Sequence, residues 1–191
     1  MDVPRIISRK TTPLSPWASL VEREVVFRDG ARPEVYHSIA QAPYVSIFAM
    51  MADGSIPIVR QYRPAVEDYT WEFPAGTVDE GETPPSAAAR ELLEETGVRA
   101  SELHDLGSFL PDTGRLSVAS NAFFARCEHA PGQAVTEPAI EVRFVSLPTL
   151  LDMVRSVEFR HQLHIALIAL AAVAGHVTLA GDSQAEGRRG S

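Results

Sequence analysis

The sequence lacks a second cysteine, a cluster of basic residues and a long apolar run. Cys127 is the one cysteine, so no disulfide framework can form within the chain, which fits a reducing compartment. We expect this thiol to be buried in a strand. The most apolar stretch, residues 163–174, contains His164 and is shorter than the roughly 20 residues that a membrane-spanning helix needs. The opening residues 1–13 lack the apolar core of a signal peptide. We therefore expect a cytoplasmic protein without membrane association.

The net charge of the chain bears on which kinds of molecule it can bind. The formal net charge is −8 over 191 residues, which argues against nucleic acid as a partner. It does not argue against an anionic small molecule, because bound divalent cations can reverse the local field. With 45% hydrophobic and 22% charged residues, the chain has the composition of one ordinary globular domain.

Short runs of β-branched and apolar residues, separated by turn signals, predict many strands and few helices. The expected strands cover 17–27, 34–41, 44–51, 55–63, 103–110, 121–127 and 141–147. The expected helices cover 84–96, 147–154 and 160–174. This order predicts an α+β fold in which helices flank a mixed sheet.

The chain divides into parts of different composition. Residues 1–42 are expected to form a separable antiparallel strand unit, whose first 16 residues are extended or loosely held. Residues 43–176 are expected to form the main domain. The tail, 177–191, is small, polar and glycine-rich, so we expect it to be disordered.

The segment 76–98, GTVDEGETPPSAAARELLEETGV, is the most informative part of the chain. Thr83 suits a helix N-cap, Pro84 suits the first helical position, and Gly97 suits the residue that ends the helix. At 100° per residue, Glu91, Glu94 and Glu95 share one narrow arc, with the small Ala87 one turn earlier. The other side of the helix, expected to face the core, carries Ala89, Leu92 and Leu93.

Clustered carboxylates point to a hard cation. Like charges at this spacing repel, and oxygen-coordinated Mg²⁺ would offset that repulsion. Arg90 can reach back to Glu82 and fix the loop, or orient a glutamate. Gly76 lets the loop backbone approach a metal closely. The alternative, a solvated acidic helix face, would require the flanking glycines, Arg90 and Glu82 to coincide by chance.

The segment fits the pattern G-x5-E-x7-R-E-U-x-E-E-x-G-U (U, aliphatic) at every position, and the chain therefore resembles the Nudix hydrolases. The resemblance implies a Nudix-type α/β/α sandwich with a mixed sheet, and hydrolysis of a diphosphate with Mg²⁺, or Mn²⁺, as cofactor. Glu91 and Glu95 match the main metal ligands of the family. Glu94 assists them, the carbonyl of Ala75 is a further ligand, and Arg90 supports catalysis.

The family signature leaves the general base open. In the ADP-ribose branch, a glutamate on a loop before the last strand has this role. Glu137 is the matching candidate here, and Glu141 is the alternative. A plain loop carboxylate is an equally good interpretation of Glu137.

The strand before the signature, VRQYRPAVEDYTWEFPAG, is similar to that of ADP-ribose and nucleoside-diphosphate-sugar pyrophosphatases. The resemblance implies that Arg60 and Arg63 contact the substrate, with Arg63 at the phosphates or the terminal sugar, where its planar fork suits phosphate oxygens. Glu72 would lie near the metal cluster or the sugar hydroxyls. The alternative for Arg63 is an exposed charge at a strand end.

The N-terminal unit contains a candidate residue for stacking on the nucleobase of the substrate. In this branch an aromatic residue of that unit often stacks on the nucleobase, and Trp17 has that place here. It could instead pack only a dimer interface or the core, and the same applies to Tyr36 and Trp71. A homodimer that exchanges its N-terminal strands is implied by the resemblance.

The loop after the signature departs from the ADP-ribose branch. That branch has a Ser-Pro-Gly type loop, whereas this chain has LPDTGRLSVASN at 110–121. Arg115 in this loop could bind a phosphate or a sugar of the substrate.

The sequence thus predicts a pyrophosphatase that converts ADP-ribose to AMP and ribose 5-phosphate, with GDP-mannose or ADP-glucose as alternative substrates. A hydrolase of dinucleoside polyphosphates or damaged nucleotides, and a non-catalytic sensor of nucleotide sugars, are the competing functions. His161 and His164 are interpreted as a helix-end or interface pair, since no third metal ligand is evident.

Overall fold

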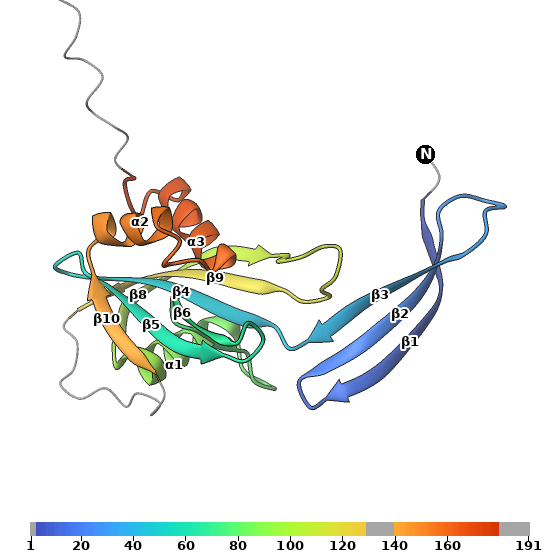
Figure 1. The fold of residues 1–191 in the computed structure, drawn as a ribbon, viewed down its shortest axis with the longest axis horizontal. Coiled ribbons are helices and arrows are strands. Elements are labelled where there is room, and N and C mark those ends of the chain that lie inside the picture. The colour runs from blue at the N-terminus through green and yellow to red at the C-terminus, as the bar shows by residue number, and fades with distance from the viewer. Residues whose placement is uncertain (1–2, 129–139, 180–191) are drawn as a thin grey trace, which may run out of the picture.

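The computed structural model describes residues 3–128 and 140–179. A small sheet at the N-terminal end projects from a larger body of strands and helices (Figure 1). This sheet consists of β1 (Arg5–Ser15), β2 (Ala18–Val26) and β3 (Glu34–Gln41), paired antiparallel in that order.

The sequence predicts that the first 16 residues are extended or loosely held, and the described ones from Arg5 to Ser15 are extended in a paired strand. Strand β1 pairs with β2 along its length, from Arg5 opposite Val26 to Ser15 opposite Ala18. Trp17 therefore lies in the tight β1–β2 turn and does not open a strand. The β-branched Ile and Thr residues of β1 favour a strand once a hairpin partner is available.

The body contains two sheets and three helices within the described residues. Its elements are β4 (Tyr44–Met51), β5 (Ile56–Arg63), β6 (Asp68–Glu72), β7 (Ala75–Thr77), α1 (Pro84–Thr96), β8 (Ala100–Phe109), β9 (Ser120–Cys127), β10 (Glu141–Val145), α2 (Leu147–Arg155) and α3 (Gln162–Val173). One sheet has the order β7-β4-β9-β8, in which β4 and β9 are parallel, and the other has the order β10-β5-β6. The α+β prediction is confirmed, and the patterns miss only the short strands β6 and β7 of this body.

Strand β4 is buried on both faces, which explains its continuous apolar sequence. Val45, Ile47 and Ala49 pack with buried residues of α1, whereas Phe48 belongs to the cluster formed with α2 and α3. Figure 1 accordingly shows α1 on one side of the sheet and α2 and α3 on the other.

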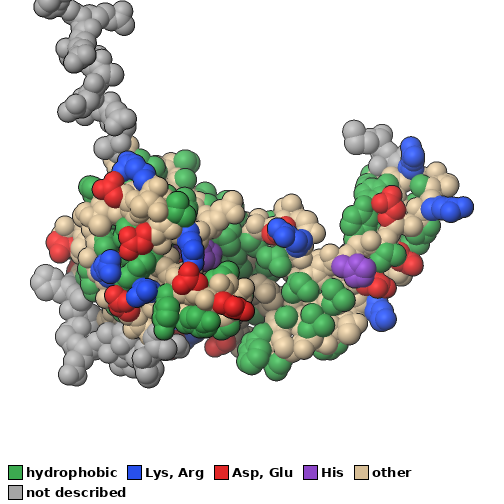
Figure 2. Space-filling model, viewed as in Figure 1, with side chains coloured by type: hydrophobic (Ala, Val, Ile, Leu, Met, Phe, Trp, Pro, Cys, Tyr) green, Lys and Arg blue, Asp and Glu red, His purple; other side chains and the backbone are tan. Residues whose placement is uncertain are grey.

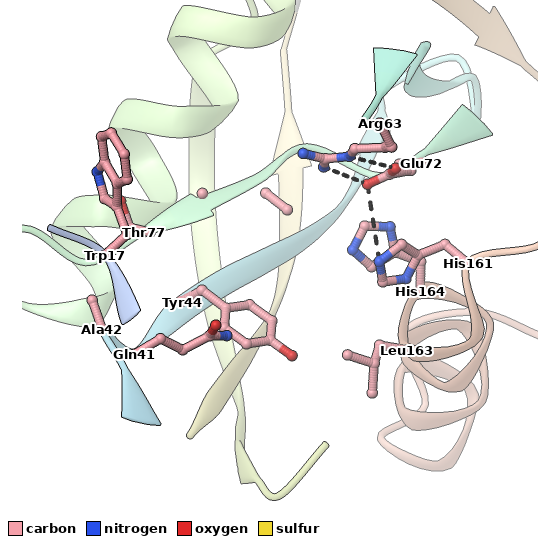
Figure 3. A pocket seen from close by; sticks show the side chains of 12 residues that line it. Trp17, Gln41, Ala42, Tyr44, Arg63, Glu72, Thr77, His161, Leu163 and His164 are labelled. Atoms are coloured by element: carbon pink, nitrogen blue, oxygen red, sulfur yellow. Dashed lines mark hydrogen bonds and ion pairs between the residues drawn. The ribbon is translucent and has the colours of Figure 1, made fainter. Parts of the chain in front are cut away.

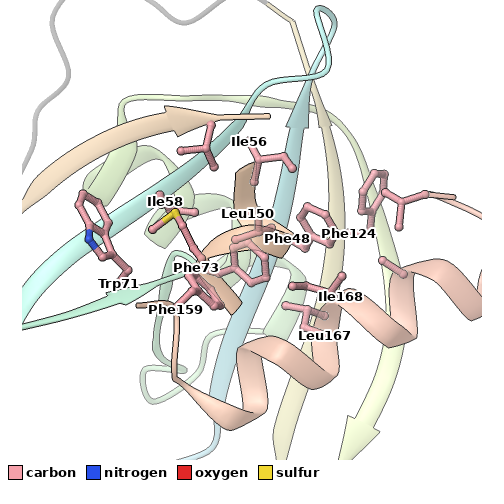
Figure 4. Packing of buried hydrophobic residues seen from close by; sticks show 14 of the residues in the cluster. Phe48, Ile56, Ile58, Trp71, Phe73, Phe124, Leu150, Phe159, Leu167 and Ile168 are labelled. Carbon is pink, nitrogen blue, oxygen red and sulfur yellow. The ribbon is translucent and has the colours of Figure 1, made fainter. Parts of the chain in front are cut away.

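Aromatic rings dominate the cluster beneath α2 and α3 (Figure 4). Phe48 stacks on Phe73 with ring centroids 4.8 Å apart, and meets Phe124 edge-on at 5.5 Å. The ring of Phe159 is tilted against that of Phe73, with centroids 5.1 Å apart. Such pairs add specific geometry to a large area of buried apolar surface.

Helix α1 has the predicted bounds and the predicted caps. The Thr83 hydroxyl accepts a hydrogen bond from the Ser86 amide at 3.4 Å, and Gly97 ends the helix at a φ of 71°. The prediction of its core-facing side is partly wrong, because Ala89 is exposed whereas Ala87 and Ala88 are buried with Leu92. The cause is that Glu91 and Glu95 of the acidic arc face the protein, whereas Glu94 is exposed.

Hydrogen bonds to the 110–119 loop join the N-terminal sheet to the body. The Ile39 amide donates to the Arg115 carbonyl at 2.8 Å, and the Ser117 amide donates to the Ile39 carbonyl at 2.8 Å. Arg23 donates to the hydroxyls of Ser38 and Ser117 beside this bridge.

Apolar side chains of the N-terminal sheet are exposed to solvent, and Figure 2 shows some of them on the projecting sheet. They include Ile6, Ile7, Leu14, Val35 and Tyr36. In the body, Cys127 is buried as predicted, and burial raises the pKa of its thiol to about 11. No helix in the described part of the chain is long and apolar enough to cross a membrane.

We expect Phe48→Ala to lower the free energy of unfolding by about 3–5 kcal/mol, because it leaves a cavity between Phe73 and Phe124. Val173→Ala is the control, because that side chain is 89% exposed, and it should change stability by less than about 0.5 kcal/mol. Urea denaturation measures both. Equal effects of the two variants would contradict this description of the core.

Candidate active site

The Glu91 carboxylate packs directly against the backbone of Gly76. A Cβ atom at position 76 would lie 2.0 Å from the carboxyl carbon of Glu91 and 2.0 Å from its Oε1. Only glycine leaves room for this approach. The glycine therefore determines where the first carboxylate of the cluster can lie.

Glu95 reaches the same stretch of backbone from the next turn of α1. The Ala75 amide donates to Glu95 Oε2 at 3.0 Å, and Glu95 is only 6% exposed. Pairing of β7 with β4 holds this backbone in place, with Ser46 opposite Ala75. Two carboxylates thus meet at Ala75 and Gly76.

Arg90 is the centre of a hydrogen-bond network around these acids. Its Nε and Nη2 donate to the two oxygens of Glu82 at 3.1 and 2.9 Å, and Nη2 also donates to the Thr77 carbonyl at 3.0 Å. Its Nη1 donates to Glu91 at 2.7 Å and to Glu94 at 3.1 Å. Arg90 thus takes both roles expected from the sequence: it fixes the loop and it orients glutamates.

The network also fixes charge states. Hydrogen bonds to Glu82, and further ones to Glu91 and Glu94, outweigh burial and raise the pKa of Arg90. The same guanidinium lowers the pKa of Glu82. Arg90 thus brings one positive charge to three carboxylates, those of Glu82, Glu91 and Glu94. The donor set of carboxylates beside backbone carbonyls fits a hard divalent cation, which takes oxygen ligands.

A cavity of about 290 Å³ opens beside Ala75 and Gly76 (Figure 3). One side is formed by residues near the N-terminal sheet: Trp17, Gln41, Ala42 and Tyr44. The other side is formed by Arg63, Glu72 and the start of α3: His161, Leu163 and His164. The β7 residues Ala75, Gly76 and Thr77 complete the lining.

Arg63 and Glu72 form a partly buried ion pair at one side of the cavity. Arg63 Nε donates to Glu72 Oε1 at 2.9 Å, and its Nη2 donates to Oε2 at 2.7 Å. Burial alone would raise the pKa of Glu72, but the hydrogen bonds from Arg63 and Thr70 outweigh it and lower that pKa. Arg63 Nη1 has no recorded hydrogen bond to the described residues, and the arginine side chain is 40% exposed. The pair therefore presents a cation to the cavity.

His161 and His164 lie beside this ion pair. Their rings stack with centroids 3.8 Å apart, and one ligand atom from each histidine and one from Glu72 fall within 4.8 Å of one another. These atoms form a possible second metal site that the sequence did not indicate. However, the Phe73 amide donates to His164 Nδ1 at 3.0 Å, so the proton of this neutral ring lies on Nε2. A protonated nitrogen cannot bind a metal, so the hydrogen bond disfavours that site.

Other residues with predicted roles lie away from the cavity. Arg60 is on the opposite face of β5, where it contacts Glu141 at 3.3 Å and lies over the rings of Tyr69 and Trp71. Arg115 is 85% exposed and donates to Asp112 at 2.7 Å. The alternative base Glu141 pairs with Arg60, and Glu137 lies outside the described residues.

Trp17 lines the cavity although it is 77% exposed, whereas Tyr36 stacks edge-on with Phe27 on the N-terminal sheet. Tyr44, Gln41 and the start of α3 also line the cavity, and the sequence did not indicate them as parts of the site. The apolar pattern of β4 shows only that Tyr44 begins a strand. His164 and Phe73 meet across 91 positions, which no local pattern predicts.

Comparisons with known proteins concern the family and the fold of this chain. The family profile described as NUDIX domain matches residues 40–163. An ADP-ribose pyrophosphatase of Mycobacterium tuberculosis is 44% identical over 87 residues, which cover 45% of this chain and 36% of that protein. An ADP-ribose pyrophosphatase of Bacillus subtilis is 32% identical over 117 residues, which cover 60% of this chain and 63% of that protein. The matched regions thus span less than two thirds of either relative.

A solved structure has a similar fold. The crystal structure of an ADP compounds hydrolase superposes with a TM-score of 0.76 and 22% identity, covering 93% of this chain and 98% of that chain. At this identity the likeness concerns the fold alone. It includes the projecting N-terminal sheet, since nearly the whole chain is covered.

We expect Gly76→Ala to fold but to bind Mn²⁺ at least tenfold more weakly, because its Cβ displaces the Glu91 carboxylate. Gly114→Ala is the matched control, since a Cβ there would meet only the Asp112 Oδ1 at 3.5 Å. Titration calorimetry measures the affinity, and thermal unfolding verifies the fold. Unchanged Mn²⁺ affinity of Gly76→Ala would remove Glu91 from the metal site.

Proposed function

This chain belongs to the Nudix family, and we propose that it is a pyrophosphatase that hydrolyses a nucleoside diphosphate linked to a sugar, with ADP-ribose as the first candidate. The observation that carries the proposal is the convergence of Glu91 and Glu95 on Ala75 and Gly76, at the wall of a cavity that Arg63 also lines. Hydrolysis of a diphosphate needs both of these groups: carboxylates that bind a metal ion, and a cationic side chain that binds the phosphate oxygens.

Glu91, Glu95 and the carbonyl of Ala75 are the proposed ligands of Mg²⁺, or Mn²⁺, with Glu94 assisting. When bound, the cation supplies charge neutralisation of the diphosphate and a lowered pKa of a coordinated water. Arg90 keeps the glutamates in position through its bonds to Glu82, Glu91 and Glu94.

The substrate phosphates are proposed to contact Arg63. Glu72 holds two of its donors, which orients the guanidinium and leaves Nη1 for a phosphate oxygen. The structure gives Arg60 and Arg115 other partners, so neither has a role in this proposal. Glu137 is retained as the proposed general base on the family resemblance alone, and it must come within hydrogen-bond reach of the attacking water.

The nucleoside is proposed to bind at the Trp17 end of the cavity, where an exposed indole offers a stacking surface. Hydrolysis of ADP-ribose there would give AMP and ribose 5-phosphate. The names of the two relatives support ADP-ribose, while the 110–121 loop keeps ADP-glucose and GDP-mannose as alternatives. A non-catalytic sensor is less well supported, because the signature keeps every glutamate.

The exposed apolar residues of the N-terminal sheet support a homodimer. Strand β1 is exposed along all eleven of its residues, and a three-stranded sheet without a covering layer leaves apolar surface in water. A second copy of the chain, placed over β1–β3, would bury these side chains. It would also bring partner residues close to Trp17.

Purified protein with Mg²⁺ should hydrolyse ADP-ribose faster than GDP-mannose or a dinucleoside polyphosphate, measured as phosphate released after added phosphatase. Glu95→Gln should lower kcat more than a hundredfold, about 3 kcal/mol of barrier. Glu102→Gln, whose side chain is 62% exposed on β8, is the control and should keep the wild-type rate. No turnover of any substrate would favour the sensor, and a near-normal rate of Glu95→Gln would exclude Glu95 from the metal site.

In solution we expect a particle of twice the 20.8 kDa protomer mass, measured by sedimentation equilibrium. Ile6→Glu, which places a charge on the exposed face of β1, should shift the protein toward the protomer. Val66→Glu is the control, because Val66 is 60% exposed but lies in the body, and it should remain a dimer. A wild-type protein that sediments at the protomer mass would disprove the dimer.

A further inference from the structure

The cavity beside the Nudix signature has two chemically different ends. In Figure 3, Trp17 and Gln41 lie on one side, and Arg63, Glu72 and His164 lie on the other. The chain from Glu72 to Thr77 runs between these sides, so Ala75 and Gly76 lie between them. If the nucleoside binds beside Trp17 and the diphosphate beside Gly76, the group beyond the second phosphate meets His164.

His164 is a buried residue that still lines this cavity. It is 1% exposed, its ring stacks on His161, and its Nδ1 accepts the Phe73 amide at 3.0 Å. These contacts hold the ring in one orientation and leave Nε2 as a hydrogen-bond donor. Burial lowers the pKa of His164 to about 3, so the ring is neutral at physiological pH.

The Nε2 donor has no recorded acceptor among residues 3–128 and 140–179. The nearest carboxylate, Glu72, already accepts hydrogen bonds from Arg63 and Thr70. As an atom of a residue that lines the cavity, Nε2 is placed to donate to water or to a bound ligand.

The position of the ring indicates which ligand atom it meets. Arg63 and the carboxylates at Ala75 and Gly76 are the groups that suit a diphosphate, so the group beyond the second phosphate, which in a nucleotide sugar carries hydroxyls, is the one left to meet His164. We propose that His164 is a specificity-determining residue whose Nε2–H donates to a hydroxyl of the sugar on the distal phosphate. This inference rests on the proposed function, because it assumes a diphosphate beside Gly76.

Two substitutions separate this role from a structural one. His164→Asn keeps an acceptor near the Nδ1 position for the Phe73 amide but removes the distal donor. His164→Gln keeps a distal amide donor but loses the acceptor. We expect His164→Asn to raise KM for ADP-ribose about tenfold, the loss of one hydrogen bond, with a smaller change in kcat. His164→Gln should have a KM close to wild type but a lower melting temperature.

The reverse pattern, a normal KM for His164→Asn and a raised KM for His164→Gln, would overturn the inference and leave only support of the Phe73 backbone. ADP methyl ester, which has no hydroxyl beyond the second phosphate, serves as the comparison substrate. The preference of the wild type for ADP-ribose over this ester should fall about tenfold in His164→Asn. Equal affinity of the wild type for both compounds would also overturn the inference, and this measurement needs no variant.

Calorimetric binding of ADP-ribose and ADP methyl ester in EDTA distinguishes the two proposals, since no hydrolysis occurs there. A wild type that binds ADP-ribose more tightly than the ester, with His164→Asn losing that preference, supports the role of His164 even if turnover fails with Mg²⁺. Failure of turnover would then refute only the proposed activity. A wild type that binds neither compound in EDTA and hydrolyses neither with Mg²⁺ would overturn the inference together with the substrate class.

Discussion

The contact between the Glu91 carboxylate and the Cα of Gly76 is the constraint on which the rest of the site depends. A carboxylate can lie this close to a backbone only where no side chain intervenes. Once Glu91 is in that place, Glu95 follows one turn later on the same helix and meets the neighbouring amide of Ala75. Pairing of β7 with β4 then connects this backbone to the most buried strand of the body. The proposed metal site is therefore supported by a strand of the core.

Arg90 and Arg63 both carry a guanidinium group, but the two groups have different electrostatic roles. Arg90 is saturated by carboxylates and a carbonyl, so its function is to hold acids that would otherwise repel one another. Arg63 is held on one side only, which leaves part of its fork toward the cavity. A diphosphate between them would have the glutamates held by Arg90 on one side, where a metal ion must neutralise the charges. On the other side it would have Arg63, which can bind phosphate oxygens directly. This asymmetry gives the cavity a direction along which an unsymmetrical substrate can be distinguished.

Local features of the chain were predictable from sequence, and contacts between distant segments were not. Helix α1 has its predicted bounds because Thr83, Pro84 and Gly97 act within one or two turns. The buried strand β4 follows from its own apolar run. In contrast, the exposed position of Ala89 and the pairing of Arg60 with Glu141 depend on which face packs against which neighbour. The contact of His164 with Phe73 depends on the docking of α3, which a one-dimensional pattern does not contain.

The bridge between β3 and the 110–119 loop has a mechanical consequence. Ile39 bonds to this loop near the end of β3, and Trp17 adjoins the Ala18–Gln41 pair close to that attachment. The Arg28–Gly30 turn lies at the opposite end of the sheet. The N-terminal sheet is thus attached to the body at the end that carries Trp17 and projects freely at the end that carries the turn. Bending at the attachment would move the turn by a large distance and Trp17 by a small one. Contacts made at the far turn would therefore disturb the position of the Trp17 ring less than the position of the turn itself.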